Sequence, residues 1–160
     1  MLDLPEVTTI SAQMSKVISG KTVAAFSRGN SPHKFAFLKP SAEECESLIP
    51  DKKIGPVTAD AKAIFISLEP DYVFRINEMA GRLLFHEERA TLPKKYQWIM
   101  RFTDGTCLTA TVGLWAFFGL VKAQALGDPP SRAEGISPIG AELTYQRFVA
   151  LFEEYEEPEK

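Results

Sequence analysis

Apolar residues recur at helical spacing at the start of the chain and at the spacing of strands through its middle. Segment 5–19 places its apolar side chains on one helical face, with Pro5 at a first helical position and Gly20 at a left-handed cap. We therefore expect an amphipathic N-terminal helix, whose apolar positions are Val7, Ile10, Met14, Val17 and Ile18.

The middle of the chain is typical of short strands separated by turns. Glu69-Pro70-Asp71 and Thr103-Asp104-Gly105 each predict a hairpin, and residues 27–32 predict a turn. Ser41 and Glu44 have capping-box spacing and predict a short helix. About eight strands are expected, over 21–26, 33–38, from Ile54 onward, 63–68, 72–76, 81–86, 96–102 and 106–112.

The last third of the chain begins with its longest apolar stretch, Val112 to Val121, which predicts a buried strand or strand pair. Residues 124–138, rich in Pro and charge, predict a loop. A closing amphipathic helix is expected over 140–155, with its apolar side formed by Leu143, Phe148, Leu151, Phe152 and Tyr155. The pattern predicts a mainly β fold: a two-sheet β-sandwich, or flattened barrel, flanked by an N-terminal and a C-terminal α-helix.

Composition adds limits to this picture. A chain of 160 residues suits one domain, and 45% apolar with 24% charged residues is ordinary for a globular protein. No apolar run reaches the roughly 18 residues that a membrane span needs, so we expect no membrane partner. The N-terminus has no secretory pattern.

No metal site is predicted. Cys45 and Cys107 lie far apart and form no Cys-x-x-Cys pair, so we expect two buried free thiols rather than a disulfide or a zinc site. His33 and His86 are expected at surface or structural positions.

The formal net charge of −3 is unusual for a binder of duplex DNA, which generally presents a basic face. Much of the acid lies at the C-terminus. Residues 153–160 hold five Glu and one Lys, and without them the balance would be about +1. The body of the chain is therefore nearly neutral, which permits DNA binding without indicating it.

Several islands of sequence occur in an order that resembles one family. The chain opens with Leu2-Asp3-Leu4-Pro5-Glu6-Val7, and Gly20-Lys21-Thr22 follows the first helix. The later islands are 61–68, Glu78-Met79-Ala80-Gly81, Lys94-Lys95 with the hairpin at Asp104-Gly105, and Gly135-Ile136-Ser137-Pro138. Together they resemble the N-terminal domain of the formamidopyrimidine-DNA glycosylase/endonuclease VIII family, which opens with Pro-Glu-Leu-Pro-Glu-Val after the initiator Met.

The resemblance implies a domain over residues 1–155, with 156–160 as an acidic tail or the start of a linker. The helix–two-turn–helix and zinc-finger domains of the family are absent from this chain, so no cofactor is expected in it. Damaged double-stranded DNA is the implied partner, and a bacterial cytosol or nucleoid the implied cytoplasmic location.

The same resemblance implies a DNA glycosylase/AP lyase. In the family the N-terminal amine attacks C1′ of the damaged nucleotide and forms a Schiff base, which is covalent catalysis by an amine. Leu2 would supply that amine here if Met1 is removed. Asp3 would transfer protons at the sugar ring, and Glu6 would orient the terminus.

Four further residues are expected to contact DNA. Lys62 would bind a phosphate, although a solvated edge lysine gives the same pattern. Met79 would fill the gap left by an extruded base or else pack in a turn. Lys94 and Lys95 would contact phosphates or form an exposed basic loop.

Two departures from the family keep alternatives open. Leu2 replaces the Pro nucleophile, and a retained Met1 would move the amine by one residue, about 3.8 Å. Residues 113–119 lack the Arg pair of the family's inserting loop, so Trp115 or Phe117 is either an apolar wedge or a core strand residue. The alternatives to an active enzyme are a catalytically impaired damaged-DNA-binding homologue and a protein-interaction module.

Overall fold

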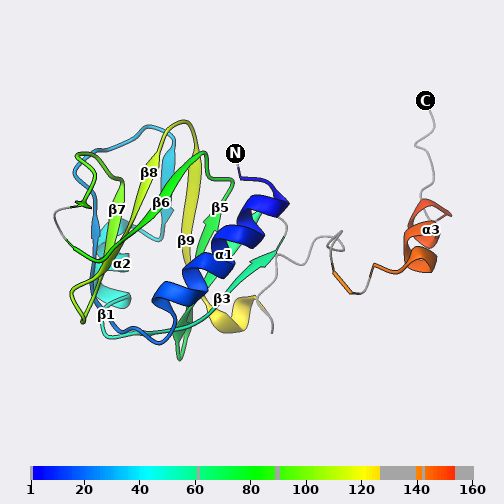
Figure 1. Cartoon of the computed structure of the whole chain (residues 1–160), viewed down its shortest axis with the longest axis horizontal. Helices are drawn as coiled ribbons and strands as arrows, with labels where there is room; N and C mark the ends of the chain where they lie inside the picture. The colour runs from blue at the N-terminus through cyan, green and yellow to red at the C-terminus, as the bar shows by residue number, and fades with distance from the viewer. Residues whose placement is uncertain (1, 61, 89–90, 127–139, 142, 154–160) are drawn as a thin grey trace.

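Two β-sheets packed face to face make up most of the molecule (Figure 1). The computed structural model describes residues 2–60, 62–88, 91–126, 140–141 and 143–153. One sheet has four strands in the order β1-β7-β8-β6, and the other has five in the order β2-β9-β5-β4-β3. The strands are β1 (Val23–Arg28), β2 (Ala36–Lys39), β3 (Lys53–Asp60), β4 (Ala63–Glu69), β5 (Tyr72–Asn77), β6 (Gly81–His86), β7 (Trp98–Phe102), β8 (Cys107–Val112) and β9 (Ala116–Lys122).

Helices accompany the two sheets, one near each end of the chain and a short one between them, as the element order shows. They are α1 (Leu4–Ile18), the short α2 (Ala42–Leu48), a 3-10 turn η2 (Ala123–Ala125) and α3 (Tyr145–Glu153). The predicted fold class, a mainly β two-sheet sandwich with an N-terminal and a C-terminal helix, is confirmed. Among the described residues, no helix is long and apolar enough to cross a membrane.

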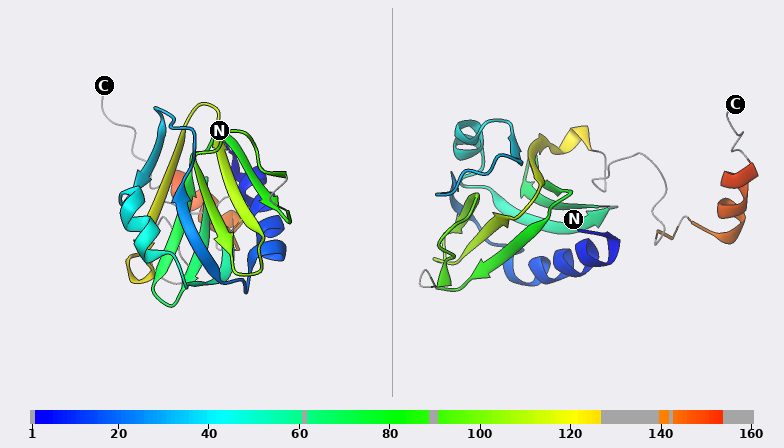
Figure 2. Two further views of the ribbon diagram at one scale, coloured as in Figure 1. Left: turned by 90° about the vertical axis from the view of Figure 1, so that its left-hand side faces the viewer. Right: turned by 90° about the horizontal axis from the view of Figure 1, so that it is seen from above.

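Helix α1 packs its apolar face on β3 and β4 (Figures 1 and 2). Val7, Met14 and Ile18 are buried on that face, whereas the predicted apolar position Val17 is exposed. The helix ends before Gly20, whose φ of +82° is the left-handed conformation that glycine adopts without strain. These contacts fix the start of the chain against the edge of the larger sheet.

Aromatic residues from both sheets fill the core between them. Trp98 of the four-stranded sheet packs against Phe74 and Phe118 of the five-stranded sheet, with ring centroids 5.4 and 5.6 Å apart. Phe26 completes the group at 5.8 Å from Trp98. Aromatic pairs in such tilted and edge-to-face arrangements stabilise a core beyond their buried area.

Both predicted hairpins form, as β4–β5 and β7–β8. The predicted short helix is α2, and its capping box is complete: Glu44 N–H donates to Ser41 Oγ, and Ser41 N–H donates to a carboxylate oxygen of Glu44. Local turn and cap chemistry was therefore sufficient to place these elements.

Three of the predicted strand boundaries differ clearly from the structure. Strand β1 continues through Arg28, where a turn was expected. Residues 33–35 are not strand, and β2 begins only at Ala36 because it pairs in parallel with β9 from that position. The stretch from Val112 to Val121 is interrupted by residues 113–115, which connect β8 to β9 outside both strands.

Cys45 and Cys107 are free and buried, as predicted. Burial raises the pKa of the Cys45 thiol to about 11, and the nearby Glu44 and Glu46 carboxylates act in the same direction. His86 is also buried, between the hydroxyls of Thr91 and Thr109 at 3.0 and 2.9 Å. It is a structural histidine, in agreement with the expectation.

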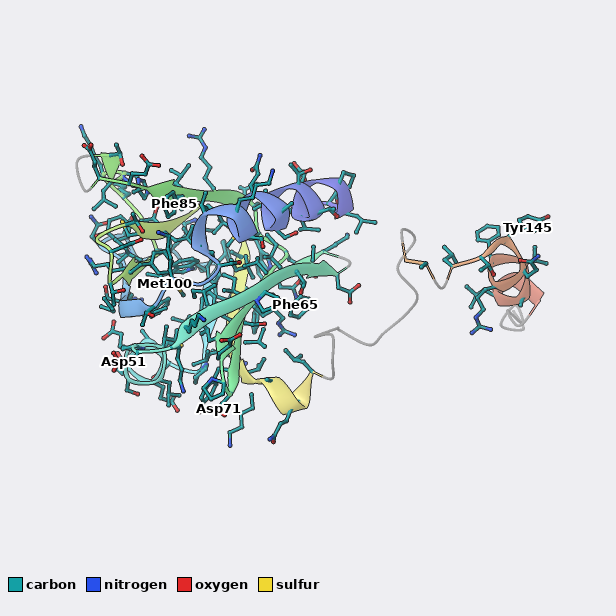
Figure 3. All side chains as sticks on the ribbon, turned by 60° about the horizontal axis from the view of Figure 1, so that its bottom comes forward. Asp51, Phe65, Asp71, Phe85, Met100 and Tyr145 are labelled. Atoms are coloured by element: carbon teal, nitrogen blue, oxygen red, sulfur yellow. The ribbon has the colours of Figure 1, made fainter. Side chains whose placement is uncertain are left out.

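Helix α3 begins at Tyr145, later than the predicted start at residue 140, and the structure describes it through Glu153. Tyr145, Phe148 and Leu151 are exposed, and Tyr145 lies on α3 apart from the sheets (Figure 3). Met1, most of the predicted loop 124–138, the side chain of Phe152, and Tyr155 lie outside the described residues.

Candidate functional site

One end of the sandwich collects nearly all the residues that the sequence singled out. At this end β5 finishes, β4, β6 and β9 begin, and the chain's first described residues meet the β5–β6 turn. We call this end the N-terminal rim and define it by residues 2–6, 62, 78–80, 94–97 and 113–115. Five separate segments of the chain therefore share one surface.

Backbone hydrogen bonds hold the rim together. Leu2 N–H donates to the carbonyl oxygen of Met79 at 2.8 Å, and Ala80 N–H donates to that of Trp115 at 2.7 Å. Glu78 N–H donates to the carbonyl oxygen of Lys62 at 3.4 Å. Because these bonds join separate connections, the β5–β6 turn is the centre around which the rim is built.

The three predicted catalytic residues lie together at the start of α1. Leu2 is half-buried against the core, and Asp3 and Glu6 are exposed. The Glu6 carboxylate accepts a hydrogen bond from Asp3 N–H at 2.9 Å. This bond fixes the chain just after Leu2 and leaves the Asp3 carboxylate at the solvent-facing edge of the rim.

Lys62 is exposed immediately before β4. Its backbone is held by the Glu78 hydrogen bond, so the ammonium group stands on the same rim as the N-terminal segment. This is a position from which a lysine can meet a phosphate that lies across the rim.

Met79 occupies the turn itself, but its side chain is only 1% exposed and belongs to the main hydrophobic core. The sequence left two roles open for Met79, gap filling in DNA and packing in the turn, and the burial of its side chain fits packing in the turn. Gap filling in DNA stays a prediction, and it would require the side chain to leave the core.

Lys94 and Lys95 are both exposed in the connection from β6 to β7. Their carbonyl oxygens accept hydrogen bonds from the Asn30 side-chain amide at 3.0 Å and the Thr111 hydroxyl at 3.3 Å. The segment is thus anchored through its backbone, and its two ammonium groups extend from a defined position.

An exposed group of aromatic side chains adjoins the rim, and sequence reasoning missed most of it. Trp115 is 41% exposed in the β8–β9 connection, so the expectation that it is a core strand residue was wrong. Phe117, by contrast, is half-buried in β9. Trp115 contacts Phe37 at 4.9 Å and Phe35 at 6.2 Å between ring centroids, and we call these three residues the aromatic cluster. Phe35 and Phe37 alternate with other residues in the sequence, but this alternation was interpreted as part of a strand over 33–38 and not as an exposed cluster.

Positive charge is concentrated in two segments despite the net charge of −3, and one of them includes residues 94–97 of the rim. Residues 28–42 and 91–103 contain no Asp or Glu. Their basic residues are Arg28, Lys34, Lys39, Lys94, Lys95 and Arg101. The carboxylates at the rim come from Asp3, Glu6 and Glu78. The surface is therefore mixed, with local stretches that favour an anionic partner.

Within the described part of the chain, no group of three or more His, Cys, Asp or Glu residues could hold a metal ion.

Residues 1–111 match a family model described as the formamidopyrimidine-DNA glycosylase N-terminal domain. A formamidopyrimidine-DNA glycosylase from Chloroflexus aurantiacus is 26% identical over 146 residues, which cover 86% of this chain and 51% of that protein.

Solved structures of the Lactococcus lactis Fpg protein share the fold. A complex with an inhibitor and a THF-containing DNA has a TM-score of 0.68 at 19% identity, covering 78% of this chain and 46% of that one. A complex with an abasic site containing DNA has a TM-score of 0.66 at 19% identity, covering 77% and 44%. The chain thus spans about half the length of these relatives.

Proposed function

Because the chain belongs to the formamidopyrimidine-DNA glycosylase family through its N-terminal domain, we propose that it is a base-excision repair domain acting on damaged double-stranded DNA. It would remove oxidised bases as a glycosylase/AP lyase, through a Schiff base on its N-terminal amine. Residues 1–155 would form the domain, working in the bacterial cytosol or nucleoid within a protein whose remaining parts supply further DNA contacts.

The observation that supports this proposal most is the convergence at the N-terminal rim. Leu2, Asp3 and Glu6 come from the start of the chain and Lys62 from the β3–β4 connection, yet all four lie around the β5–β6 turn. This chemistry needs an amine, which the Leu2 nitrogen would supply once Met1 is removed, together with carboxylates and a cation for a phosphate. Their meeting across about sixty residues of sequence is unexpected for unrelated surface residues.

Each group has a definite part in the proposed reaction. The amine attacks C1′ of the damaged nucleotide, the base departs, and the resulting Schiff base allows elimination to cut the strand. Asp3 moves a proton at the sugar ring. Glu6 positions the terminus, since its carboxylate already accepts a hydrogen bond from the backbone N–H of Asp3.

The remaining residues would hold the DNA. Lys62 binds a phosphate beside the extruded nucleotide, and Lys94 and Lys95 bind phosphates further along the duplex. Met79 would enter the gap in the base stack if the β5–β6 turn opens, and otherwise supports the turn from within.

A second candidate is a damaged-DNA-binding homologue with impaired catalysis. Leu2 stands where the family has Pro, and its nitrogen donates a hydrogen bond to Met79. A nitrogen held in this way is poorly placed to attack a sugar. In this candidate the rim recognises the lesion and leaves the strand intact.

Borohydride trapping on an oligonucleotide with a single abasic site separates the two candidates. An active enzyme gives a covalent adduct that is lost when the N-terminal amine is acetylated. An impaired homologue gives no adduct but retains lesion binding. The Leu2→Pro variant, with loss of Met1 checked by intact mass, should then gain the adduct if the rest of the rim is competent. Absence of both adduct and salt-dependent DNA binding would contradict both candidates and favour the protein-interaction module.

A further inference from the structure

Strand β2 lies at the edge of the five-stranded sheet, with β9 as its neighbouring strand. The Ala116 N–H donates to the carbonyl oxygen of Phe35 at 3.0 Å, so the backbone carbonyl of Phe35 faces β9. Backbone groups alternate in direction along a strand, so the N–H and C=O of Leu38 point away from β9. Among the described residues no further strand of this sheet follows on that side. Such an edge can pair with a strand from another chain.

A cavity of about 350 Å³ borders this edge strand. Its lining includes Ala36 and Leu38 of β2, Arg28 at the end of β1, Trp98 at the start of β7, and the start of α2. Ala36 and Leu38 are the side chains of β2 that pack against the main core. A strand added beside β2 would alternate its side chains in the same way, so one set would enter this cavity.

The opposite face of β2 carries the aromatic cluster. Phe35 and Phe37 are 44% and 37% exposed, and Trp115 lies against both. The Lys34 ammonium lies 5.5 Å from the centre of the Phe35 ring, and Lys39 is exposed on the same face of β2 as Phe37. Exposed apolar patches bordered by charge mark interaction sites.

Charge differs between the two sides of β2. Segment 28–42 contains no Asp or Glu, and its cations Lys34 and Lys39 accompany the exposed aromatic rings. The cavity has both a cation and an anion in its lining, Arg28 and Glu43. An added strand is therefore favoured by carboxylates on its outer face and by uncharged side chains on the cavity side.

We propose that β2 binds a short extended peptide of a partner protein, which adds to the sheet as a further strand. The peptide backbone pairs with the N–H and C=O of Leu38. Small uncharged side chains enter the cavity, and an aromatic side chain on the other face contacts the aromatic cluster between two carboxylates that meet Lys34 and Lys39. Strand addition gives affinity through the backbone, and the alternate side chains give specificity.

The capped pentapeptide acetyl-Glu-Val-Phe-Val-Glu-amide is the probe for this inference. In a ¹⁵N-resolved NMR titration of the whole chain without DNA, it should shift the backbone amide signal of Leu38 and the indole N–H signal of Trp115 saturably. The amide signals of β5 should stay nearly unchanged. The amide of Leu38 is the decisive signal, because contact with the aromatic cluster alone would not place a hydrogen bond there.

Two control peptides separate the contributions of backbone and charge. The same peptide N-methylated on its three central residues cannot donate the backbone hydrogen bonds, and acetyl-Lys-Val-Phe-Val-Lys-amide reverses the charges. Each should bind about tenfold more weakly than the probe, because each loses a group of polar contacts.

Variants at exposed positions test the same contacts from the protein side. The double variant Lys34→Glu, Lys39→Glu should weaken binding of the probe about tenfold and bind the lysine peptide more tightly than the probe. Phe37→Ala should weaken binding of the probe about fivefold. Lys53→Glu is the matched control, since Lys53 is exposed in β3, and it should bind as wild type does. Thermal melting checks that each variant is folded.

No saturable shift of the Leu38 amide with millimolar probe would overturn the inference, as would equal binding of the N-methylated peptide or unchanged affinity in the double variant. Oligothymidylate that shifts the Trp115 signal at lower concentration than the probe does would assign this surface to single-stranded nucleic acid instead. These titrations do not depend on borohydride trapping, so the inference and the proposed function can fail separately.

Discussion

The backbone N–H of Leu2 donates to the carbonyl oxygen of Met79, 2.8 Å away, and this bond ties the opening of the chain to the β5–β6 turn. The position of the first residues thus depends on a turn nearly eighty residues later in sequence. Anything that displaces the turn should displace the proposed amine with it. The catalytic geometry and the stability of the sandwich are therefore linked at this point.

Gly81→Ala should damage both stability and proposed activity. A Cβ at this position would lie 2.0 Å from the Thr111 carbonyl oxygen and 3.0 Å from Met79 Cε, so the turn must shift. We expect a loss of about 1–3 kcal/mol in the free energy of unfolding, measured by urea denaturation, together with weaker borohydride trapping.

Gly113→Ala is the matched control for that variant. Its nearest neighbour, the Ala80 carbonyl oxygen, would lie at 3.6 Å, which is ordinary contact. Equal stability losses in the two variants would contradict the argument from close approach.

The Lys62→Ala variant should weaken DNA binding by a similar factor whatever the base sequence of the DNA. Removing one phosphate contact should also reduce the slope of log affinity against log salt by about 1. Lys53→Ala is the control, because Lys53 is exposed at the other end of β3. Fluorescence anisotropy at several salt concentrations measures both slopes, and an unchanged slope in Lys62→Ala would remove this residue from the interface.

The Trp115→Ala variant should weaken binding to damaged DNA while leaving the stability of the fold nearly unchanged. The side chain is 41% exposed and its ring lies against those of Phe35 and Phe37, which are also exposed, so its loss should cost less than about 1 kcal/mol of stability. If Trp115 inserts into or stacks on disrupted DNA, lesion binding should fall about tenfold or more. A variant with normal binding would leave the aromatic cluster without a role in DNA recognition.

Stability should fall with decreasing pH through the titration of His86. Burial lowers the pKa of this imidazole below its ordinary 6.5 and outweighs the opposing effect of the hydrogen bond with Thr91. The unfolded chain therefore takes up a proton at a higher pH than the folded protein does. The contribution is present above about pH 6.5 and is lost as the pH falls below it.

Urea midpoints at pH 7.5 and pH 5.5 check this expectation. The His86→Gln variant should be less stable at pH 7.5, because burial and two hydrogen bonds are disturbed, and should show a smaller drop between the two pH values. An identical drop in wild type and variant would assign the pH dependence to other groups.

Neither thiol should react in the folded protein. Cys45 is fully buried with its pKa raised to about 11, and Cys107 is buried in β8. A thiol reagent such as DTNB should modify about two groups per chain only after denaturation. Rapid reaction of one thiol at neutral pH without denaturant would show that its segment opens readily.

Local patterns predicted the elements whose determinants are local. The spacing of Val7, Met14 and Ile18 identified α1, and Ser41 with Glu44 identified α2. The turns at Pro70 and Gly105 predicted two hairpins, and both form. In each case the residues that decide the structure lie within one turn or one helix.

Features that depend on distant partners were not predicted. The parallel pairing of β2 with β9 shortens β2, because residues 33–35 have no neighbouring strand to bind. Trp115 looked like part of a buried strand since its neighbours in sequence are apolar, but it occupies a connection between two sheets. The cavity beside Trp98 is lined by residues between Arg28 and Glu43, by Gln97 and by Phe118, so it forms only when these distant parts of the chain pack together.

The open edge at β2 also has a dynamic consequence. This strand has four residues, none of them fully buried, and it lies at the edge of its sheet with β9 as its neighbouring strand. Its amides should exchange with solvent through local opening that costs less than global unfolding, well before those of β5. The cavity wall and part of the aromatic cluster belong to this weakly attached strand. This part of the sandwich should therefore open first, while the N-terminal rim, which includes the start of α1, stays in place.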